Sequence, residues 1–402
     1  MKSLDDALWA LIERAPSPPA VESVALGQAL GRVLAESVAA PFDVPAFDNS
    51  QMDGYAVRLA DLQADASGNT SPLPIGARIA AGDPLTTLPP ESVARIFTGA
   101  PIPAGADAVI MQEQAALQPD GRVVFSAIPP LGENIRPRGG DLATGQTVLS
   151  AGIRLSAADL GLLASVGHPA VRVYKPLRVA VFSSGNELRQ PGQALGSGQI
   201  YDSNRPMVMG LVAGLGCEVS DLGCLPDRFE VTRDALAAAA QDHDIILTCG
   251  GVSVGEEDHI KAAVQDQGEL DLWKVAIKPG RPFAHGRIGQ AHFMGMPGNP
   301  VSAWVTFVLL VRPFVLKASG LADPMPEAVW LQAGFDWPKP DSRQEFLRAW
   351  IDDEGRVGIH AKQNSQLLSS VSGSRGLVEI PAKTPIQKGD QVRYFGYPGL
   401  LT

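Results

Sequence analysis

The sequence is poor in cysteine, has no excess of basic residues and contains no long apolar run. Its three cysteines among 402 residues are too few for a disulfide framework, match no common zinc spacing and are typical of a reducing cytosol. With 33 Lys and Arg against 43 Asp and Glu, the net charge of -10 disfavours a nucleic-acid partner. The longest apolar run, 301–311, ends at Arg312 and is too short to span a membrane. Acidic side chains interrupt residues 1–15, which therefore show no signal peptide. We expect a cytoplasmic protein that binds neither nucleic acid nor a membrane.

Familiar single motifs of enzyme chemistry are also missing. The chain has no Walker A loop and no dinucleotide fingerprint, and no histidine accompanies a serine or cysteine nucleophile motif. Its six histidines are scattered without metal-ligand spacing, so we interpret them as structural or surface residues. A site must therefore be sought in loops that the fold brings together.

Proline is unevenly distributed, and this divides the first half of the chain. Thirteen of the 33 prolines lie in residues 41–137, which predicts short strands and irregular loops there. Helical patterns at 4–12 and 157–166 flank this stretch, and the simplest packing places the two helices together. We expect a small helical linker domain (1–26 and 144–172) that carries an inserted, Pro-rich, mostly β domain (27–143).

A different pattern begins near residue 173. Apolar strands are predicted at 177–182, 244–249 and 292–296, and they alternate with helices, the last of which covers 300–316. This alternation predicts βαβ units with a mostly parallel sheet in an α/β domain of residues 173–322. Short alternating strands after it predict a small C-terminal β-barrel at 323–402. The fold class is therefore multidomain α/β plus β.

Three of the predicted parallel strands end in glycine-containing loops. Because ligands bind beyond the carboxyl ends of parallel strands, these loops are expected at one ligand-binding edge, where their N–H groups suit an anion. Ordinary tight turns are the alternative for any one loop. The candidate substrate-binding residues in the loops are Ser184, Gly185, Gly250, Gly251, Ser253, Gly255, Pro297, Gly298, Asn299 and Ser302.

Charged residues accompany these loops. Asp258 follows the second loop and is either a helix-start residue or a Mg²⁺ ligand, since Mg²⁺ takes one or two carboxylates plus substrate phosphate oxygens. Lys274, Lys278 and Arg281 form a local basic cluster in an acidic chain. Arg281 suits bidentate binding of an oxyanion, and the lysines would act as point charges.

Seven motifs occur in an order that resembles a known family. They are FDNSQMDGYA (47–56), FTGAPIP (97–103), SGNEL (184–188), YDSN (201–204), GGVSVG (250–255), IKPG (277–280) and MPGNP (296–300). Together they resemble the molybdopterin molybdenumtransferase family, which comprises the MoeA proteins and the gephyrin E domain. The resemblance covers nearly the whole chain.

The resemblance implies a reaction and an assembly. Members insert molybdate-derived metal into adenylylated molybdopterin and release AMP. They are elongated four-domain homodimers whose cleft lies between the α/β domain of one subunit and the β-rich domain of the other. By resemblance, the catalytic residues are Asp53, Thr98, Asp141, Glu187, Asp227, Lys274 and Lys278, and Mg²⁺ lies near Glu187 and Asp258. Arg348, Ser365 and Ser369 in the last domain also resemble cleft-lining positions.

Three other functions are weighed against this one. The α/β domain also resembles the separate molybdopterin adenylyltransferase of the pathway, which is in addition a candidate partner. A gephyrin-like scaffold would not need Asp53, Glu187 and Asp258 together. A regulator that stores molybdate leaves the Mg²⁺-type carboxylates unexplained.

Overall fold

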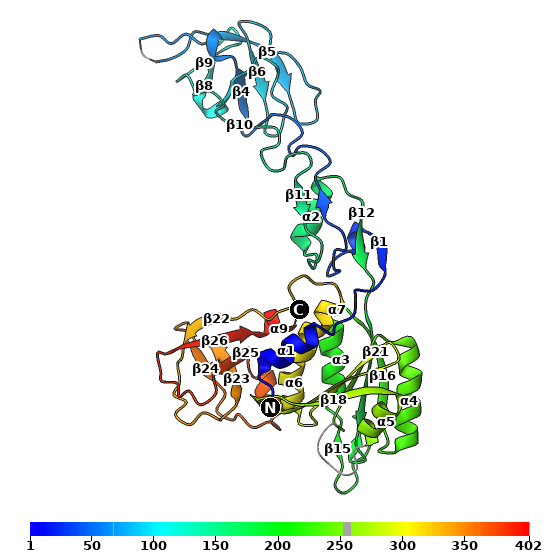
Figure 1. Ribbon diagram of the computed structural model, residues 1–402. Helices are drawn as coiled ribbons and strands as arrows, with labels where there is room; N and C mark the ends of the chain where they lie inside the picture. The colour runs from blue at the N-terminus through cyan, green and yellow to red at the C-terminus, as the bar shows by residue number, and fades with distance from the viewer. Residues whose placement is uncertain (67, 252–258, 402) are drawn as a thin grey trace.

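The computed structural model describes residues 1–66, 68–251 and 259–401. The chain forms an elongated molecule in which a β-rich domain lies at one end, a narrow linker in the middle and two packed domains at the other end (Figure 1). The predicted multidomain α/β plus β fold is confirmed.

The α/β domain is built on a six-stranded sheet in the order β16-β13-β17-β21-β20-β18. The first four strands are parallel, as expected, whereas β20 and β18 form an antiparallel edge that the sequence reading did not predict. The strands are β13 (Arg178–Ser184), β16 (Glu218–Leu225), β17 (Ile245–Cys249), β18 (Gly268–Lys274), β20 (Pro282–Ile288) and β21 (Ala291–Met296). A short pair, β14 (Leu188–Arg189) and β15 (Ile200–Tyr201), lies beside it.

Both faces of this sheet are covered, which explains its continuous apolar strands. Val179 and Val181 of β13 pack in one core, and Ala180 and Phe182 pack in the other. This alternation follows from the two-residue period of a strand. Helices α4 (Phe229–Asp242) and α5 (His259–Gln267) cover the second face, and α3 (Asn204–Gly214) covers the first.

A long apolar helix completes the first face. It consists of α6 (Pro300–Thr306), the π-helical segment η4 (Phe307–Val311) and α7 (Arg312–Ala318). Within the described ranges it is the one helix whose length and composition would suit a membrane span, yet 94% of it is buried inside the protein. It is therefore a core helix of this domain.

The first helix, α1 (Leu4–Ile12), packs against this core helix. Ser3 caps it, and its apolar face, formed by Leu4, Ala7, Leu8 and Leu11, is buried in the α/β core. The expected packing of α1 against α2 (Ala157–Ser165) is wrong, because α2 belongs to a separate small core. The apolar face of α1 is buried instead in the core that contains α7 and η4.

The linker region consists of α2 and two narrow antiparallel ribbons. One ribbon pairs β1 (Val21–Ala25) with β12 (Ala170–Tyr174), and the other pairs β2 (Val38–Ala39) with β11 (Thr147–Leu149). Figure 1 shows these ribbons between the β-rich domain and the rest of the molecule.

The β-rich domain at the tip, called the distal domain below, holds a six-stranded sheet in the order β7-β4-β6-β5-β9-β8. Two small apolar cores lie within it. Its strands are β3 (Asn49–Ser50), β4 (Gly54–Val57), β5 (Leu73–Ile79), β6 (Val93–Ile96), β7 (Ala108–Met111), β8 (Ala115–Leu117), β9 (Arg122–Phe125) and β10 (Ile135–Arg136).

The C-terminal domain is a second β structure. Its sheet runs β19-β23-β25-β26-β22, and β24 also pairs with β23. A bridge joins Ala333, directly after β22, to Val357 in β24. Strand β19 comes from the α/β part of the sequence. The elements are β19 (Ile277–Lys278), β22 (Val329–Gln332), β23 (Gln344–Ile351), β24 (Val357–Ile359), β25 (Gly376–Ile380), β26 (Gln391–Gly396), α8 (Leu368–Ser372) and α9 (Tyr397–Leu401).

Candidate functional site

The three glycine-containing loops meet, as the sequence predicts, at the carboxyl ends of β13, β17 and β21. They surround a cavity of about 740 Å³, called the first cavity below. Predicted residues in its wall are Ser184, Glu187, Gly250, Gly251, Pro297, Gly298, Asn299 and Ser302. The described loop backbone can approach a ligand closely, since Gly250 and Gly251 have φ of 95° and 67°. A Cβ on Gly251 would lie 2.1 Å from the side chain of Ile260.

Two wall residues that the site prediction missed fix the loops. Asn204 donates from Nδ2 to the carbonyl of Gly298 at 2.7 Å. The buried carboxylate of Asp202 accepts from Arg205 Nε at 3.0 Å. Both residues belong to the YDSN motif, so the motif itself was the available signal. The bond of Asn204 ties the start of α3 to the loop after β21, and the bond of Asp202 orders the start of α3 itself.

A smaller cavity of about 410 Å³ adjoins the first one and shares Pro282, Asn299 and Ser302 with it. This second cavity lies between the α/β and C-terminal domains. Its wall includes Lys278, Arg281 and Arg343, together with polar groups from 363–365. The predicted pair Lys278 and Arg281 is therefore brought together, and Arg343 joins it from the other domain. Such a wall suits a small anion.

Behind this wall lies a completely buried arginine. Arg348 on β23 is 0% exposed, and its Nε lies 3.2 Å from Ser370 Oγ. One of its terminal nitrogens donates to the carbonyl of Asn364 at 3.4 Å, and Asn364 lines the second cavity. Burial lowers the pKa of Arg348 to about 10. Among the residues that the structure describes, no carboxylate forms an ion pair with Arg348, so its charge favours an anion nearby.

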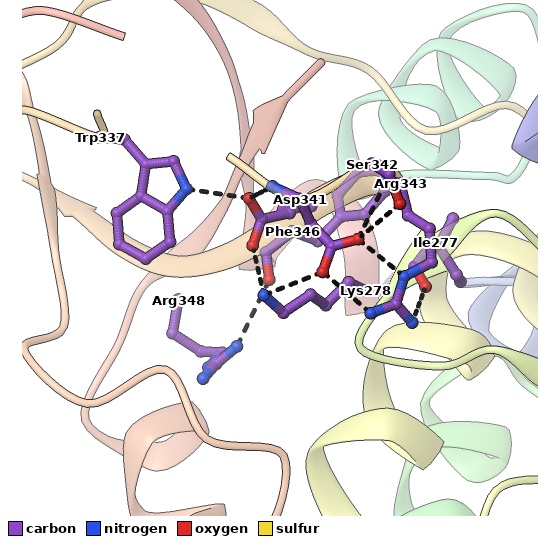
Figure 2. A network of polar contacts seen from close by, with 9 residues as sticks. Ile277, Lys278, Trp337, Asp341, Ser342, Arg343, Phe346 and Arg348 are labelled. Carbon is purple, nitrogen blue, oxygen red and sulfur yellow. Dashed lines mark hydrogen bonds and ion pairs between the residues drawn. The ribbon is translucent and has the colours of Figure 1, made fainter. Parts of the chain in front are cut away.

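Lys278, a cation of the second cavity, has two carboxylate partners. Its Nζ lies 3.0 Å from Glu345 Oε1 and 3.3 Å from Asp341 Oδ2. Figure 2 shows Lys278 and Asp341 within this network of polar contacts. Burial lowers the pKa of Lys278, but hydrogen bonds and charges from Glu345 and Asp341 outweigh burial, so that its pKa is raised. The lysine therefore stays positively charged.

Asp53 and Thr98 meet in the distal domain. The backbone N–H and the hydroxyl of Thr98 both donate to Asp53 Oδ1 at 2.8 Å. These two bonds hold the pKa of Asp53 below its ordinary value. The distal domain lies far from both cavities of the same chain (Figure 1). One chain therefore does not unite Asp53 with Glu187.

The remaining predicted residues either line neither of the two cavities or lie outside the described residues. Asp141 is exposed and follows β10 in the sequence, and its N–H donates to the carbonyl of Val44. Asp227 and the exposed Lys274 line neither of the two cavities, and Gly185 lines a separate surface hollow next to Asn186. Ser253, Gly255 and Asp258 lie outside the described residues.

The first cavity also fits the expected mode of Mg²⁺ binding. Glu187 is exposed there, and a Cβ on Gly185 would lie 2.5 Å from its carboxylate, so the glycine makes room for this side chain. No group of three acidic, histidine or cysteine side chains suited to a metal occurs in 1–66, 68–251 and 259–401. One or two carboxylates completed by substrate phosphate oxygens would meet the requirement of Mg²⁺.

Comparison with family models places the chain in one class of protein. Residues 2–167 match the model described as the MoeA N-terminal region (domain I and II), and residues 180–317 match a probable molybdopterin binding domain. Residues 331–395 match the MoeA C-terminal region (domain IV). The fold and its cavities are thus those of a multidomain MoeA-type protein.

Individual relatives agree over almost the full length. The molybdopterin molybdenumtransferase of Haemophilus influenzae is 43% identical over 376 residues, 92% of each chain. That of Synechococcus elongatus is 35% identical over 92% of this chain and 93% of its own. The structure of the molybdopterin biosynthesis MoeA protein from Pyrococcus horikoshii OT3 superposes with a TM-score of 0.86 at 29% identity, covering 99% of this chain and 100% of that one. The chain belongs to the molybdopterin molybdenumtransferase family, and the resemblance inferred from its motifs is confirmed.

Proposed function

We propose that this protein is a transferase of molybdenum cofactor biosynthesis that inserts molybdenum from molybdate into adenylylated molybdopterin and releases AMP. The observation that supports the proposal best is the adjacency of two cavities of different character. The walls of the first cavity combine glycine, polar and apolar residues, and the second cavity has cationic walls, with Asn299 and Ser302 common to both. A bulky phosphorylated substrate and a small dianion can therefore occupy neighbouring positions.

Adenylylated molybdopterin is assigned to the first cavity. Its pyrophosphate needs N–H donors and cations where charge accumulates during cleavage. The loops at Gly250 and Gly298 bring backbone close to that space, and the hydrogen bond from Asn204 holds the loop at Gly298 in place. Mg²⁺ at Glu187, and at Asp258 outside the described residues, would neutralise charge on the pyrophosphate oxygens.

Molybdate is assigned to the second cavity. It is a tetrahedral dianion, and Lys278, Arg281 and Arg343 surround a space of about 410 Å³. The hydroxyls of Ser302 and Ser365 are further donors to an oxyanion. The buried guanidinium of Arg348, which has no carboxylate partner in the part of the chain that the structure describes, adds positive potential behind the wall.

A homodimer completes the site in this proposal. Asp53 and Thr98 lie on a domain that stands away from its own cavities (Figure 1). A second copy of the chain can present its distal domain to these cavities, so that each site contains residues of both chains. The proposed location is the cytoplasm, in keeping with three free cysteines. A transient complex with the adenylyltransferase of the pathway would deliver the substrate.

The decisive experiment measures AMP release from adenylylated molybdopterin with Mg²⁺, with and without molybdate. Molybdate-dependent AMP release, with molybdenum retained on the pterin, is the expected result. Consumption of ATP and molybdopterin without AMP release from the adenylylated substrate would instead indicate an adenylyltransferase. Absence of both reactions would contradict the enzymatic proposal.

A further inference from the structure

We propose that Glu345 and Asp341 are positioning residues that share Lys278 with the bound oxyanion and keep that oxyanion weakly held, so that it can be transferred. The inference rests on the assignment of molybdate to the second cavity. It concerns two carboxylates for which neither the motifs nor the charge pattern suggested a role.

Lys278 and Glu345 are paired by the backbone as well as by their charges. β19 and β23 are parallel neighbours, and Lys278 lies opposite Glu345 in their register. The 3.0 Å contact between Nζ and Oε1 therefore joins the α/β segment to the C-terminal domain (Figure 2). The side chain of Glu345 is 1% exposed, so water cannot take the place of Lys278 as the partner of this carboxylate.

Glu345 is itself firmly held. Its other oxygen, Oε2, accepts from Trp337 Nε1 at 2.9 Å and from the N–H of Asp341 at 2.8 Å. A buried carboxylate with these fixed donors keeps its position, because separation from them would leave its charge uncompensated. Any movement that joins Lys278 to a ligand must therefore be made by the lysine.

Asp341 is oriented by Arg343. Arg343 donates from Nε to Asp341 Oδ1 at 3.0 Å and from a terminal nitrogen to Oδ2 at 3.1 Å. These hydrogen bonds hold the pKa of Asp341 well below its usual range, so it remains an anion. Two cations of the second cavity, Lys278 and Arg343, are thus both engaged by Asp341.

The two carboxylates leave Lys278 few N–H groups for a ligand. A lysine ammonium has three N–H groups, and two are directed to Glu345 and Asp341. One remains for an oxyanion in the cavity, toward which the partly exposed Lys278 can turn. The same two carboxylates repel an incoming dianion. Tight binding of a substrate before reaction does not accelerate its conversion. Because Glu345 and Asp341 compete with the oxyanion for Lys278, the oxyanion is released more readily to the reaction.

The test compares Glu345→Gln with the unaltered chain by equilibrium dialysis against molybdate and by steady-state kinetics. The amide keeps the shape but removes the negative charge and frees Lys278. We expect molybdate to bind about tenfold more tightly, while kcat falls and KM for molybdate also falls. A purely structural role would raise KM or leave it unchanged. Glu379→Gln, which removes a carboxylate paired with Arg393 on the same sheet, is the charge-matched control.

A second variant tests whether the effect of Glu345→Gln acts through Lys278. In Lys278→Met, the Glu345→Gln change should alter molybdate affinity much less than in the unaltered chain. An unchanged or weakened affinity in Glu345→Gln, or an equal effect in both backgrounds, would overturn the inference and leave the proposed function standing. Failure of the unaltered chain to bind molybdate would overturn both. If Glu345→Gln does not fold, Asp341→Asn is expected to shift affinity in the same direction by a smaller factor.

Discussion

Thr98 donates both its backbone N–H and its hydroxyl to a single carboxylate oxygen of Asp53, each at 2.8 Å. This pair occupies a domain that lies well away from the cavities of its own chain. The arrangement permits a clean test of whether the site is shared between two chains.

Asp53→Ala and Glu187→Ala are each expected to abolish turnover, because each removes one part of the proposed composite site. Both residues are at least partly exposed, so thermal unfolding should change little. When the two inactive variants are mixed and their subunits exchange, one site of each mixed dimer is unaltered. Random exchange should therefore restore about a quarter of the original activity. No restoration, despite mixed dimers seen by native mass spectrometry, would contradict the shared site.

Thr98→Val should change the pH dependence of turnover. The hydroxyl of Thr98 helps to lower the pKa of Asp53, whereas its backbone N–H survives the substitution. The pKa of Asp53 should rise toward its ordinary value of 3.8, and the acid limb of kcat/KM should move to higher pH. Thr98→Ser keeps the hydroxyl and should retain the original profile. An acid limb that stays in place in Thr98→Val would mean that another group controls it.

Removal of divalent cations should suppress AMP release, and Mg²⁺ should restore it. Glu187→Gln keeps the size of the side chain but weakens a hard-cation ligand, so the Mg²⁺ concentration at half-maximal activity should rise at least about tenfold. Glu218→Gln, at the exposed start of β16 and therefore at the opposite end of the sheet from the loops, is a matched control. Full activity in a chelator would exclude the Mg²⁺ requirement.

The protein should lose stability as the pH falls below about 6.5 because of two buried histidines. His285 and His292 are each 3% exposed, and His285 Nε2 lies 3.3 Å from His292 Nδ1. Burial lowers the pKa of His285 to about 3 and that of His292 to about 4. Arg14 and Arg287 add to the effect, whereas Asp271 opposes it at His285.

The sign of this effect follows from proton uptake. Between pH 6.5 and about 4 the unfolded chain binds protons that the folded chain does not, so the free energy of unfolding decreases, by at most about 1.4 kcal/mol per pH unit for each histidine. Urea unfolding at several pH values measures the slope. His285→Gln with His292→Gln should flatten it, whereas His360→Gln in the C-terminal domain should leave it intact. An equal slope in the double variant would refute the assignment.

The parts of the fold that sequence predicted best are those with strong local periodicity. The apolar strands around Val179 and Ile245 and the helix after Pro300 are continuous and bounded by glycine or proline, so their patterns are unambiguous. The loops at their ends could be assigned to one edge because parallel strands place their carboxyl ends together.

Non-local pairing accounts for what sequence did not predict. α1 has an apolar face that would suit several partners, and only the three-dimensional core shows that α7 is chosen. The two-residue β19 is too short to show a strand pattern, yet it pairs with β23 across a domain border. Glu345 looked like an ordinary strand residue because its lysine partner lies 67 positions away in the sequence, at Lys278.

The two narrow ribbons of the linker connect the distal domain to the rest of the molecule, so bending of these ribbons moves the whole domain. Any rotation of the distal domain relative to the α/β domain has to bend the strand pairs β1–β12 and β2–β11. A small change of angle there becomes a larger displacement of the distal domain, which lies at one end of the molecule (Figure 1). In the proposed dimer, the bending stiffness of these few hydrogen-bonded residues would therefore set how accurately the distal domain meets the neighbouring chain.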